Sequence, residues 1–187
     1  MRIYRNRSLT TLPGHLTRPT SAKVREALFN IWQDSIIECR WLDLCAGNGS
    51  MGAEALCRGA REVIGIEMYG KACKTIKQNW QKIATDNQNF KVIKGDVIKV
   101  IKILEGQQFN HIYFDPPYDS KLYQPVLEAI TIHKLLRKDG EIAVEHNPKL
   151  WRAIAIKGLE IRKEKYYGDN AITFYAFQHS YNEKVNK

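Results

Sequence analysis

The stretch Trp41-Leu42-Asp43-Leu44-Cys45-Ala46-Gly47-Asn48-Gly49-Ser50 decides the fold class of this chain. Residues 41–45 are mostly apolar, which predicts a buried strand. A tight glycine turn follows at residues 46–49, and Ser50 begins a helix expected to reach about Arg58, where Gly59 ends it. A strand that passes through such a turn directly into a helix is typical of an α/β fold.

The same alternation of strand and helix continues through the middle of the chain. Further strands are expected at residues 63–67, 90–94, 109–113 and 141–145. Helices are expected at residues 70–84, from Asp96 to about Leu104 and from about Tyr123 to Leu136, with a turn at 138–140. The last two strands, 159–167 and 171–177, are joined so briefly that they must be antiparallel. The pattern predicts a mostly parallel sheet with helices on both faces and a C-terminal antiparallel hairpin.

The N-terminal segment is expected to be an appendage of one domain that spans residues 1–187. Residues 2–16 indicate an extended arm or short hairpin, and Thr20 or Ser21 is expected to cap a helix that runs to about Trp32. The apolar stripe of this helix is Val24, Leu28, Phe29 and Trp32, and Arg25 lies off it. We therefore divide the chain into an arm and helix (1–35), a core (38–178) and a frayed tail (179–187).

Charge is the main clue that the composition offers. The chain has 187 residues, a net charge of +9 and a pI near 9.4. A basic surface attracts polyanions, most often nucleic acid. Six basic residues precede the first acid, Glu26; they are Arg2, Arg5, Arg7, Arg18, Lys23 and Arg25.

Other classes of protein are disfavoured by the composition. No apolar run has the length of a membrane span, so we expect a cytoplasmic protein. The four cysteines form no CxxC pair and no zinc pattern, so we expect no disulfide and no metal, with Cys45 and Cys57 as small core residues. A monomer is the default expectation.

A second stretch, Phe114-Asp115-Pro116-Pro117-Tyr118, carries the candidate chemistry. Two prolines must end the preceding strand, so an acid, a rigid turn and an aromatic ring are expected at the carboxyl edge of the sheet. Asp115 and the Pro116 carbonyl are hydrogen-bond acceptors and Tyr118 offers a flat face, which together suit a planar group with an exocyclic amine. The alternative is a plain turn with a capping Asp.

The cofactor is predicted from the acids that follow the first three strands. Residues 47–52 match GxGxxG, and Glu67 lies twenty residues after Gly47, which by itself would favour NAD. However, Asp43 would repel a pyrophosphate and would favour an ammonium group, as S-adenosyl-L-methionine carries. Asp96 is placed to accept from an adenine amine, and no segment is available for a hydride substrate domain. Each acid alone could be a strand-end cap, and the set of acids favours S-adenosylmethionine.

Together these motifs resemble the class I S-adenosylmethionine-dependent amino-methyltransferases. Within that class, Arg18-Pro19-Thr20, the run 24–30, residues 52–60 and Tyr167-Gly168 resemble the RsmD family, the methyltransferases of a guanine N2 in bacterial 16S rRNA. The resemblance implies a seven-stranded sheet of order 3-2-1-4-5-7-6, and a substrate that is an assembled or assembling 30S subunit.

The resemblance and the motifs assign the site residues. The catalytic residues are Asp115, Pro116 and Tyr118. The cofactor-binding residues are Asp43, Ala46, Gly47, Gly49, Glu67, Met68, Asp96, Val97 and Asp115. The substrate-binding residues are Arg5, Arg7, Arg18, Thr20, Lys23, Arg25, Pro117 and Tyr118.

Three rival functions stay open at this point. A methyltransferase of DNA adenine or another base would share the Asp-Pro-Pro-Tyr turn, although the DNA enzymes usually carry an added recognition domain. A methyltransferase of protein glutamine usually has Asn at the position of Asp115. An inactive RNA-binding assembly factor would not need Asp43, Glu67, Asp96 and Asp115 together.

Overall fold

The computed structural model describes residues 1–12 and 20–178 of the chain, and its centre is a seven-stranded sheet. The sheet strands are β3 (Arg40–Leu44), β4 (Glu62–Glu67), β5 (Asn89–Lys94), β6 (Phe109–Phe114), β7 (Leu136–His146), β8 (Leu159–Tyr167) and β9 (Asn170–Phe177). Their order is β5-β4-β3-β6-β7-β9-β8, and β9 alone runs against its neighbours. The predicted sheet, its order and its C-terminal antiparallel hairpin are confirmed.

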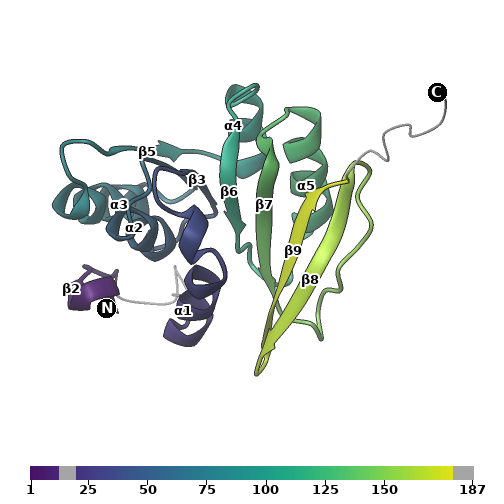
Figure 1. Ribbon diagram of the computed structural model, residues 1–187, viewed down its shortest axis with the longest axis horizontal. Helices are drawn as coiled ribbons and strands as arrows, with labels where there is room; N and C mark the ends of the chain where they lie inside the picture. Colours follow the sequence, from purple (N-terminus) through teal and green to yellow (C-terminus); the bar gives the residue numbers. More distant parts are fainter. Residues whose placement is uncertain (13–19, 179–187) are drawn as a thin grey trace, which may run out of the picture.

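Helices cover both faces of this sheet (Figure 1). One face packs against α1 (Ala22–Ile31), α2 (Ser50–Cys57) and α3 (Gly70–Ile83), and the other against α4 (Val97–Ile103) and α5 (Tyr123–Ile132). Alternate residues of each strand enter opposite cores: Trp41 and Val63 face the first three helices, whereas Leu42 and Ile64 face the other two. The molecule is therefore a three-layer α/β/α sandwich.

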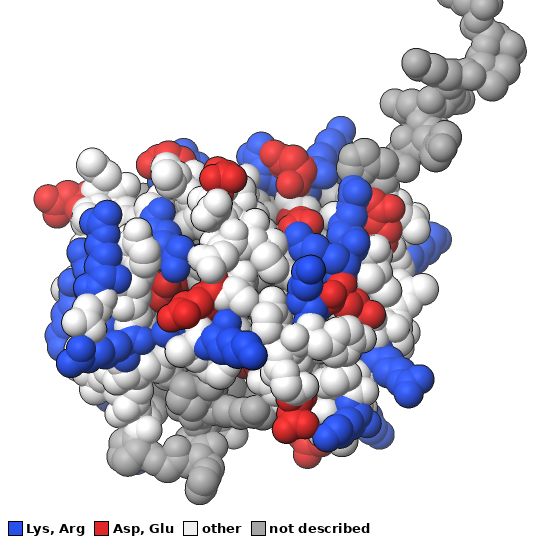
Figure 2. Space-filling view, turned by 60° about the horizontal axis from the view of Figure 1, so that its bottom comes forward, with Lys and Arg blue, Asp and Glu red and all other residues white. Residues whose placement is uncertain are grey.

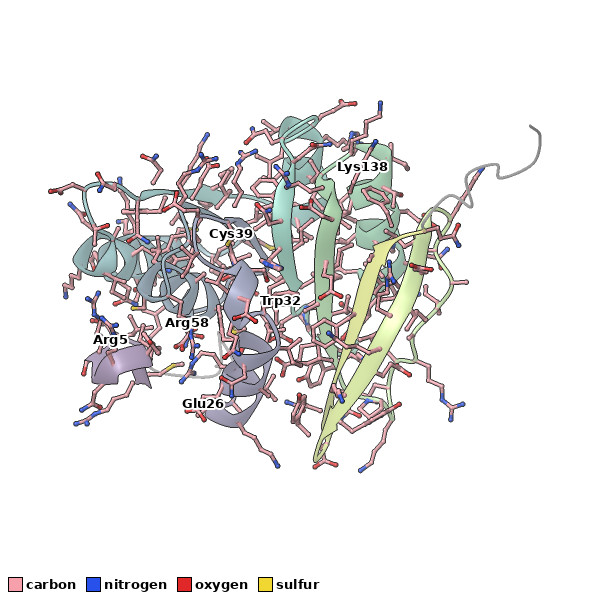
Figure 3. All side chains as sticks on the ribbon, in the orientation of Figure 1. Arg5, Glu26, Trp32, Cys39, Arg58 and Lys138 are labelled. Carbon is pink, nitrogen blue, oxygen red and sulfur yellow. The ribbon has the colours of Figure 1, made fainter. Side chains whose placement is uncertain are left out.

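The N-terminal segment is a structural part of the sandwich and is more than an appendage. Strands β1 (Arg2–Ile3) and β2 (Arg7–Ser8) form a short hairpin around a 3-10 turn, Tyr4–Asn6, which is one of the two alternatives predicted for residues 2–16; residues 13–16 lie outside the described part of the chain. Ser21 caps α1 by accepting from the Val24 N–H at 3.2 Å. The predicted apolar stripe then lies on the sheet: Phe29 stacks on Trp41 with ring centroids 5.1 Å apart, and Trp32 lies between α1 and the strands (Figure 3).

One predicted turn is wrong. Residues 138–140 were expected to be a turn before a strand at 141–145, but they lie within β7, where they form an irregularity in the pairing with β6 between the pairs Phe109–Leu136 and His111–Glu141. A Cβ on Gly140 would lie 2.8 Å from the carbonyl oxygen of Asn110, so this glycine permits close approach of the β6 backbone. The preceding helix ends at Ile132 and not at Leu136, because Lys134 has a φ of 53° that ends the helical path.

The ring of Trp80 in α3 is one reason why three positions are glycine, two of them in the GxGxxG motif and one in β4. Its buried ring fills space that a Cβ would occupy at Gly49, Gly52 or Gly65, with the closest contact 2.2 Å at Gly52. Its indole N–H also donates to the Gly49 carbonyl at 2.8 Å. Gly49 and Gly52 are thus needed for packing of α2 on α3, whereas Gly47 lines the pocket described next.

Candidate active site

A pocket of about 590 Å³ opens where β3, β4, β5 and β6 end. This is the carboxyl edge of the parallel strands, where α/β proteins bind ligands. Among the described residues, its wall contains five carboxylates and no Lys, Arg or His; the acids are Asp43, Glu67, Asp96, Asp115 and Asp119. A pocket with this lining favours a ligand that carries positive charge or many hydrogen-bond donors.

Glu67 is held rigidly at the end of β4. One carboxylate oxygen accepts from the Gly47 N–H at 2.8 Å and the other from the Tyr69 N–H at 2.8 Å. Gly47 has a φ of 56°, so the glycine turn brings this N–H to the neighbouring strand. Each oxygen keeps further acceptor capacity, so the carboxylate can still accept from a pair of ligand hydroxyls.

Asp43 is the most deeply buried acid of the pocket. Its side chain is 1% exposed and accepts from the Gly52 N–H at 3.1 Å. Burial, together with the nearby charge of Glu67, raises the pKa of this carboxyl to about 7, although the Gly52 N–H opposes the shift. A cationic ligand group that enters the pocket would therefore stabilise the charged form of Asp43.

The predicted adenine side of the pocket contains Asp96, Val97 and Met68. Asp96 caps α4 by accepting from the Lys99 N–H at 3.1 Å, and Val97 is the first residue of that helix. Val97 is buried and Met68 is 55% exposed, so the two offer apolar surface to a planar ring. Ala46 also lines the pocket, but Gly49 does not and faces Ile76 and Trp80 instead.

The Asp-Pro-Pro-Tyr turn forms another wall of the same pocket. Asp115 and Tyr118 are half-buried, Pro116 is buried and Pro117 is exposed, and all four line the cavity. The Tyr118 hydroxyl donates to the Glu145 carboxylate at 3.0 Å. The turn thus places an acid and an anchored aromatic ring beside the four other acids.

The residues predicted to bind substrate are scattered. Thr20 lines the pocket, with its hydroxyl 3.2 Å from the Tyr113 hydroxyl. Arg5, Arg7 and Lys23 are exposed on the hairpin and α1. Arg18 lies outside the described residues.

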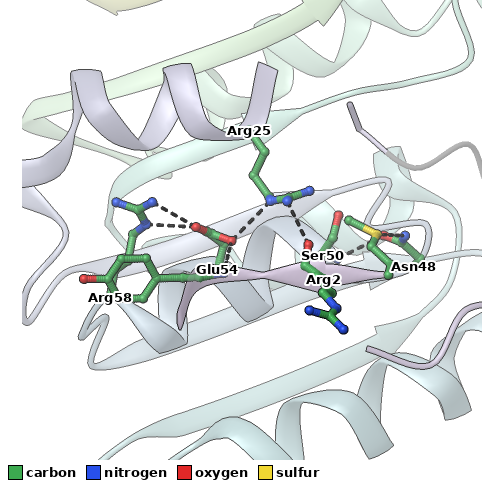
Figure 4. A network of polar contacts seen from close by, with 8 residues as sticks. Arg2, Arg25, Asn48, Ser50, Glu54 and Arg58 are labelled. Atoms are coloured by element: carbon green, nitrogen blue, oxygen red, sulfur yellow. Dashed lines mark hydrogen bonds and ion pairs between the residues drawn. The ribbon is translucent and has the colours of Figure 1, made fainter. Parts of the chain in front are cut away.

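Arg25 was predicted to contact phosphate, and the structure contradicts this. Its side chain is 4% exposed, pairs with Glu54 at 3.2 Å and donates to the Arg2 carbonyl at 3.0 Å. Glu54 also pairs with Arg58 at 2.9 Å and accepts from the Tyr4 N–H, so one buried carboxylate joins α1, α2 and the hairpin (Figure 4). A buried guanidinium that already pairs with a carboxylate and a backbone carbonyl is unavailable to RNA.

Sequence reasoning missed several residues of the site. Glu145 lies behind the Asp-Pro-Pro-Tyr turn, where it accepts from Tyr118, and both Tyr113 and Leu150 line the pocket. Leu150, 63% exposed, belongs to the loop after β7. A signal for Glu145 was present, because an acid at an inward position of an apolar strand needs partners. Cys45 lines the pocket as well as packing, partly buried, against the core on the side of α4 and α5.

The fold and the pocket together define a class I methyltransferase. A solved structure described as "Putative methyltransferase yhhF from Escherichia coli" has a similar fold, with a TM-score of 0.83, 26% identity and coverage of 95% of this chain and 98% of that one. A "putative methylase HI0767 from Haemophilus influenzae" has a TM-score of 0.77 at 27% identity, with coverage of 96% and 97%.

Sequence comparison gives the family. Residues 2–176 match the family model described as Conserved hypothetical protein 95. "Putative rRNA methyltransferase YlbH" of Bacillus subtilis is 30% identical over 173 residues, 91% of this chain and 94% of that protein. "Ribosomal RNA small subunit methyltransferase D" of Haemophilus influenzae is 30% identical over 144 residues, 76% and 75% of the two chains. The chain belongs to this family, and the resemblance to the RsmD methyltransferases is confirmed.

Proposed function

We propose that this protein transfers a methyl group from S-adenosylmethionine to the exocyclic N2 of a guanine in 16S rRNA. The observation that carries the proposal is the Asp-Pro-Pro-Tyr turn in one wall of a pocket that contains four more acids and, among the described residues, no basic side chain. Relatives named as methyltransferases of small-subunit rRNA support the substrate. The 30S subunit, assembled or assembling, is the proposed form of that substrate.

The acid-rich lining of the pocket fits S-adenosylmethionine and does not fit NAD. Asp43 would favour the ammonium of the cofactor, Glu67 its ribose hydroxyls and Asp96 its adenine amine, while Met68 and Val97 would cover the ring. A pyrophosphate would face five carboxylates and, in the part of the chain that the structure describes, no basic side chain in the pocket wall, which is strongly unfavourable. When bound, the cofactor supplies a methyl group on a positively charged sulfur.

Asp43 should make cofactor binding dependent on pH. The carboxyl has a pKa of about 7 in the folded protein against 3.8 for the ordinary group, so its uncharged form dominates below pH 7. A cationic ligand prefers the carboxylate, so affinity should rise as pH increases through about 7, by up to roughly tenfold per unit. Calorimetric titration of the cofactor between pH 6 and 8.5 would measure this, and a flat profile would contradict it.

The Asp43→Asn variant supplies the control. It should bind the cofactor more than tenfold more weakly and should lose the pH dependence. Because the folded-state pKa is raised, the stability contribution of this carboxyl is full below pH 3.8 and is lost as pH rises through about 7. The variant should therefore melt at a higher temperature than the wild type at pH 8, with a smaller difference at pH 5.

The turn is proposed to hold the base and to orient its amine. The N2 amine of guanine is a poor nucleophile because its lone pair is delocalised into the ring. Asp115 and the Pro116 carbonyl would accept its two hydrogens and favour a tetrahedral nitrogen, and Asp115 would also favour the positive charge that develops there. Tyr118 would stack on the base, a contact worth about 1–3 kcal/mol. Positioning of this kind is worth several kcal/mol.

Basic residues of the N-terminal segment are proposed to contact the RNA backbone. Figure 2 shows basic side chains interspersed with acidic ones on one face of the molecule, so net charge alone does not locate the RNA path. Arg5 and Arg7 on the hairpin and Lys23 on α1 are exposed, and α1 begins beside Thr20 at the pocket. The hairpin and the start of α1 thus offer exposed cations, and the start of α1 lies at the pocket.

Removal of these cations should weaken RNA binding in a salt-dependent way. In an Arg5→Ala, Arg7→Ala, Lys23→Ala triple variant, the slope of log affinity against log salt should flatten by about 2–3, since each lost phosphate contact contributes about 0.7–0.9. The matched control removes the same charge from the exposed face of α3 with Lys71→Ala, Lys74→Ala and Lys77→Ala. Equal slopes for the two variants would refute a specific role for the hairpin and α1.

Methyl mapping tests the proposed function itself. Labelled S-adenosylmethionine is incubated with the protein and 30S subunits from a strain that lacks its own copy of the gene, and the labelled nucleotide is identified. Label on one 16S guanine N2 is the expected result. Label on DNA or on a protein would retain the methyl transfer and reject the rRNA substrate, and absence of cofactor binding would favour an inactive assembly factor.

No described helix is long and apolar enough to cross a membrane. A cytoplasmic monomer that acts without a metal is the form proposed for this activity. Among the described residues, no group of three or more His, Cys, Asp or Glu side chains could hold a metal ion.

A further inference from the structure

A carboxylate that the proposed chemistry does not use lies directly behind the catalytic turn. Glu145 is next to the last residue of β7 and is 1% exposed. The register pairs Phe114 of β6 with Val144 of β7, so Glu145 is level with Asp115 at the carboxyl edge of the sheet. The two acids therefore belong to the same corner of the site, although Glu145 does not line the pocket.

Three separate segments donate hydrogen bonds to Glu145. One carboxylate oxygen accepts from the Tyr118 hydroxyl at 3.0 Å and from the Asn170 side-chain amide at 2.9 Å, and the other accepts from the Tyr113 hydroxyl. The donors come from the catalytic turn, the start of β9 and the end of β6. A carboxylate this deeply buried requires such donors, because its charge has little access to water.

The acceptor-only nature of a carboxylate fixes the direction of this network. Tyr113 must donate its proton to Glu145, and burial with the nearby acids raises the pKa of Tyr113 well above its usual value, which keeps that proton in place. The Tyr113 oxygen is then the acceptor for Thr20, 3.2 Å away. A directed chain runs from Thr20, ahead of α1, through Tyr113 to Glu145.

We propose that Glu145 is a positioning residue for methyl transfer, because it holds the Tyr118 hydroxyl and thereby fixes the plane of the ring on which the target base stacks. The prolines fix the backbone at one end of Tyr118, and Glu145 fixes the hydroxyl at the other. This leaves the ring face as the surface that is presented to the pocket. The proposal rests on the proposed function for the identity of the stacked base.

Glu145→Gln is the informative substitution, because the glutamine keeps the size of the side chain. Its NH2 group must face a donor from Tyr113 or from Tyr118 and Asn170, so at least one bond of the network is lost. A small displacement of a base-holding group has a large kinetic effect. We expect kcat for methylation of 30S subunits to fall by roughly 10–100-fold, with cofactor affinity within about twofold of wild type.

Two further variants make this test specific. Tyr118→Phe keeps the ring and loses the same hydrogen bond, so the kcat of the double variant should be no lower than that of the worse single variant. Glu141→Gln is the matched control. Glu141 lies on the same face of β7 and accepts from the Trp32 indole at 2.7 Å, and it is paired with His111 of β6, away from the turn. The kcat of this variant should be unchanged. Independent, multiplying losses for Glu145→Gln and Tyr118→Phe would overturn the proposal, as would normal turnover in Glu145→Gln.

Hydrogen exchange separates this inference from the proposed function. The amides of Tyr118, Asp119 and Ser120 should exchange faster in Glu145→Gln and in Tyr118→Phe than in the wild type and Glu141→Gln. If these amides exchange faster in the two variants but the wild type fails to methylate 30S subunits, the rRNA substrate is rejected and the positioning role of Glu145 is kept. Unchanged exchange would reject the positioning role, whatever the substrate is.

Discussion

Replacement of Asp115 by alanine should abolish methyl transfer while the protein stays folded and still binds the cofactor. The variant loses the acceptor that holds the N2 amine and the negative charge that favours the developing ammonium. Loss of one such preorganised group costs about 10²–10³-fold in kcat, and the loss of a charge places Asp115→Ala at or beyond the upper limit. Single-turnover methylation of 30S subunits measures the loss, and calorimetry measures cofactor affinity.

The control for this result is Asp139→Ala, which removes an exposed carboxylate near the start of β7, at the end of the strand away from the Asp-Pro-Pro-Tyr turn. Its turnover should equal that of the wild type. A rate for Asp115→Ala within tenfold of the wild type would show that the turn holds the base without help from the acid. A parallel loss of cofactor affinity would instead assign Asp115 chiefly to the cofactor.

Replacement of Gly52, in the first turn of α2, by alanine should strongly destabilise the fold. The new Cβ would lie 2.2 Å from Cζ2 and 2.9 Å from both Cε2 and Cη2 of the buried Trp80 ring. Overpacking of a core costs about 1–3 kcal/mol, and a contact this short falls at the upper limit. For a chain of this size, we expect the melting temperature to fall by about 6–12 °C.

Two variants test whether Trp80 is the cause. Gly70→Ala adds a methyl group to the start of α3, where the nearest atom would be the Lys94 Nζ at 3.5 Å, so it should leave the melting temperature unchanged or slightly raised. Gly52→Ala combined with Trp80→Phe should be less destabilising than the sum of the two single changes. If the destabilisation of the double variant equals the sum of the two single changes, the strain of Gly52→Ala does not come from contact with Trp80.

The sequence predicted the centre of the sheet well because β3, β4 and β6 are short and largely buried, and each ends at or close to a glycine, a proline or an acid. The antiparallel final hairpin followed from a connection too short for a crossover. The turn at residues 138–140 was predicted wrongly, because Gly140 and its neighbours have the composition of a turn. Only the pairing of Leu136 and Glu141 with β6 on both sides of this irregularity, where Gly140 lies beside the Asn110 carbonyl, shows that these residues belong to one strand.

By itself the sequence determined which edge of the sheet carries the pocket and four of the five acids that line it. Asp43 lies near the end of a strand, Glu67 ends one, and Asp96 and Asp115 follow one, and the ends of parallel strands meet in space. The tertiary structure alone decided the roles of side chains whose partners are far away along the chain. Arg25 is in the buried pair with Glu54, Gly52 makes room for Trp80, and Glu145 holds Tyr118. Local sequence fixes where a strand ends, whereas burial and hydrogen-bond partners depend on contacts between distant segments.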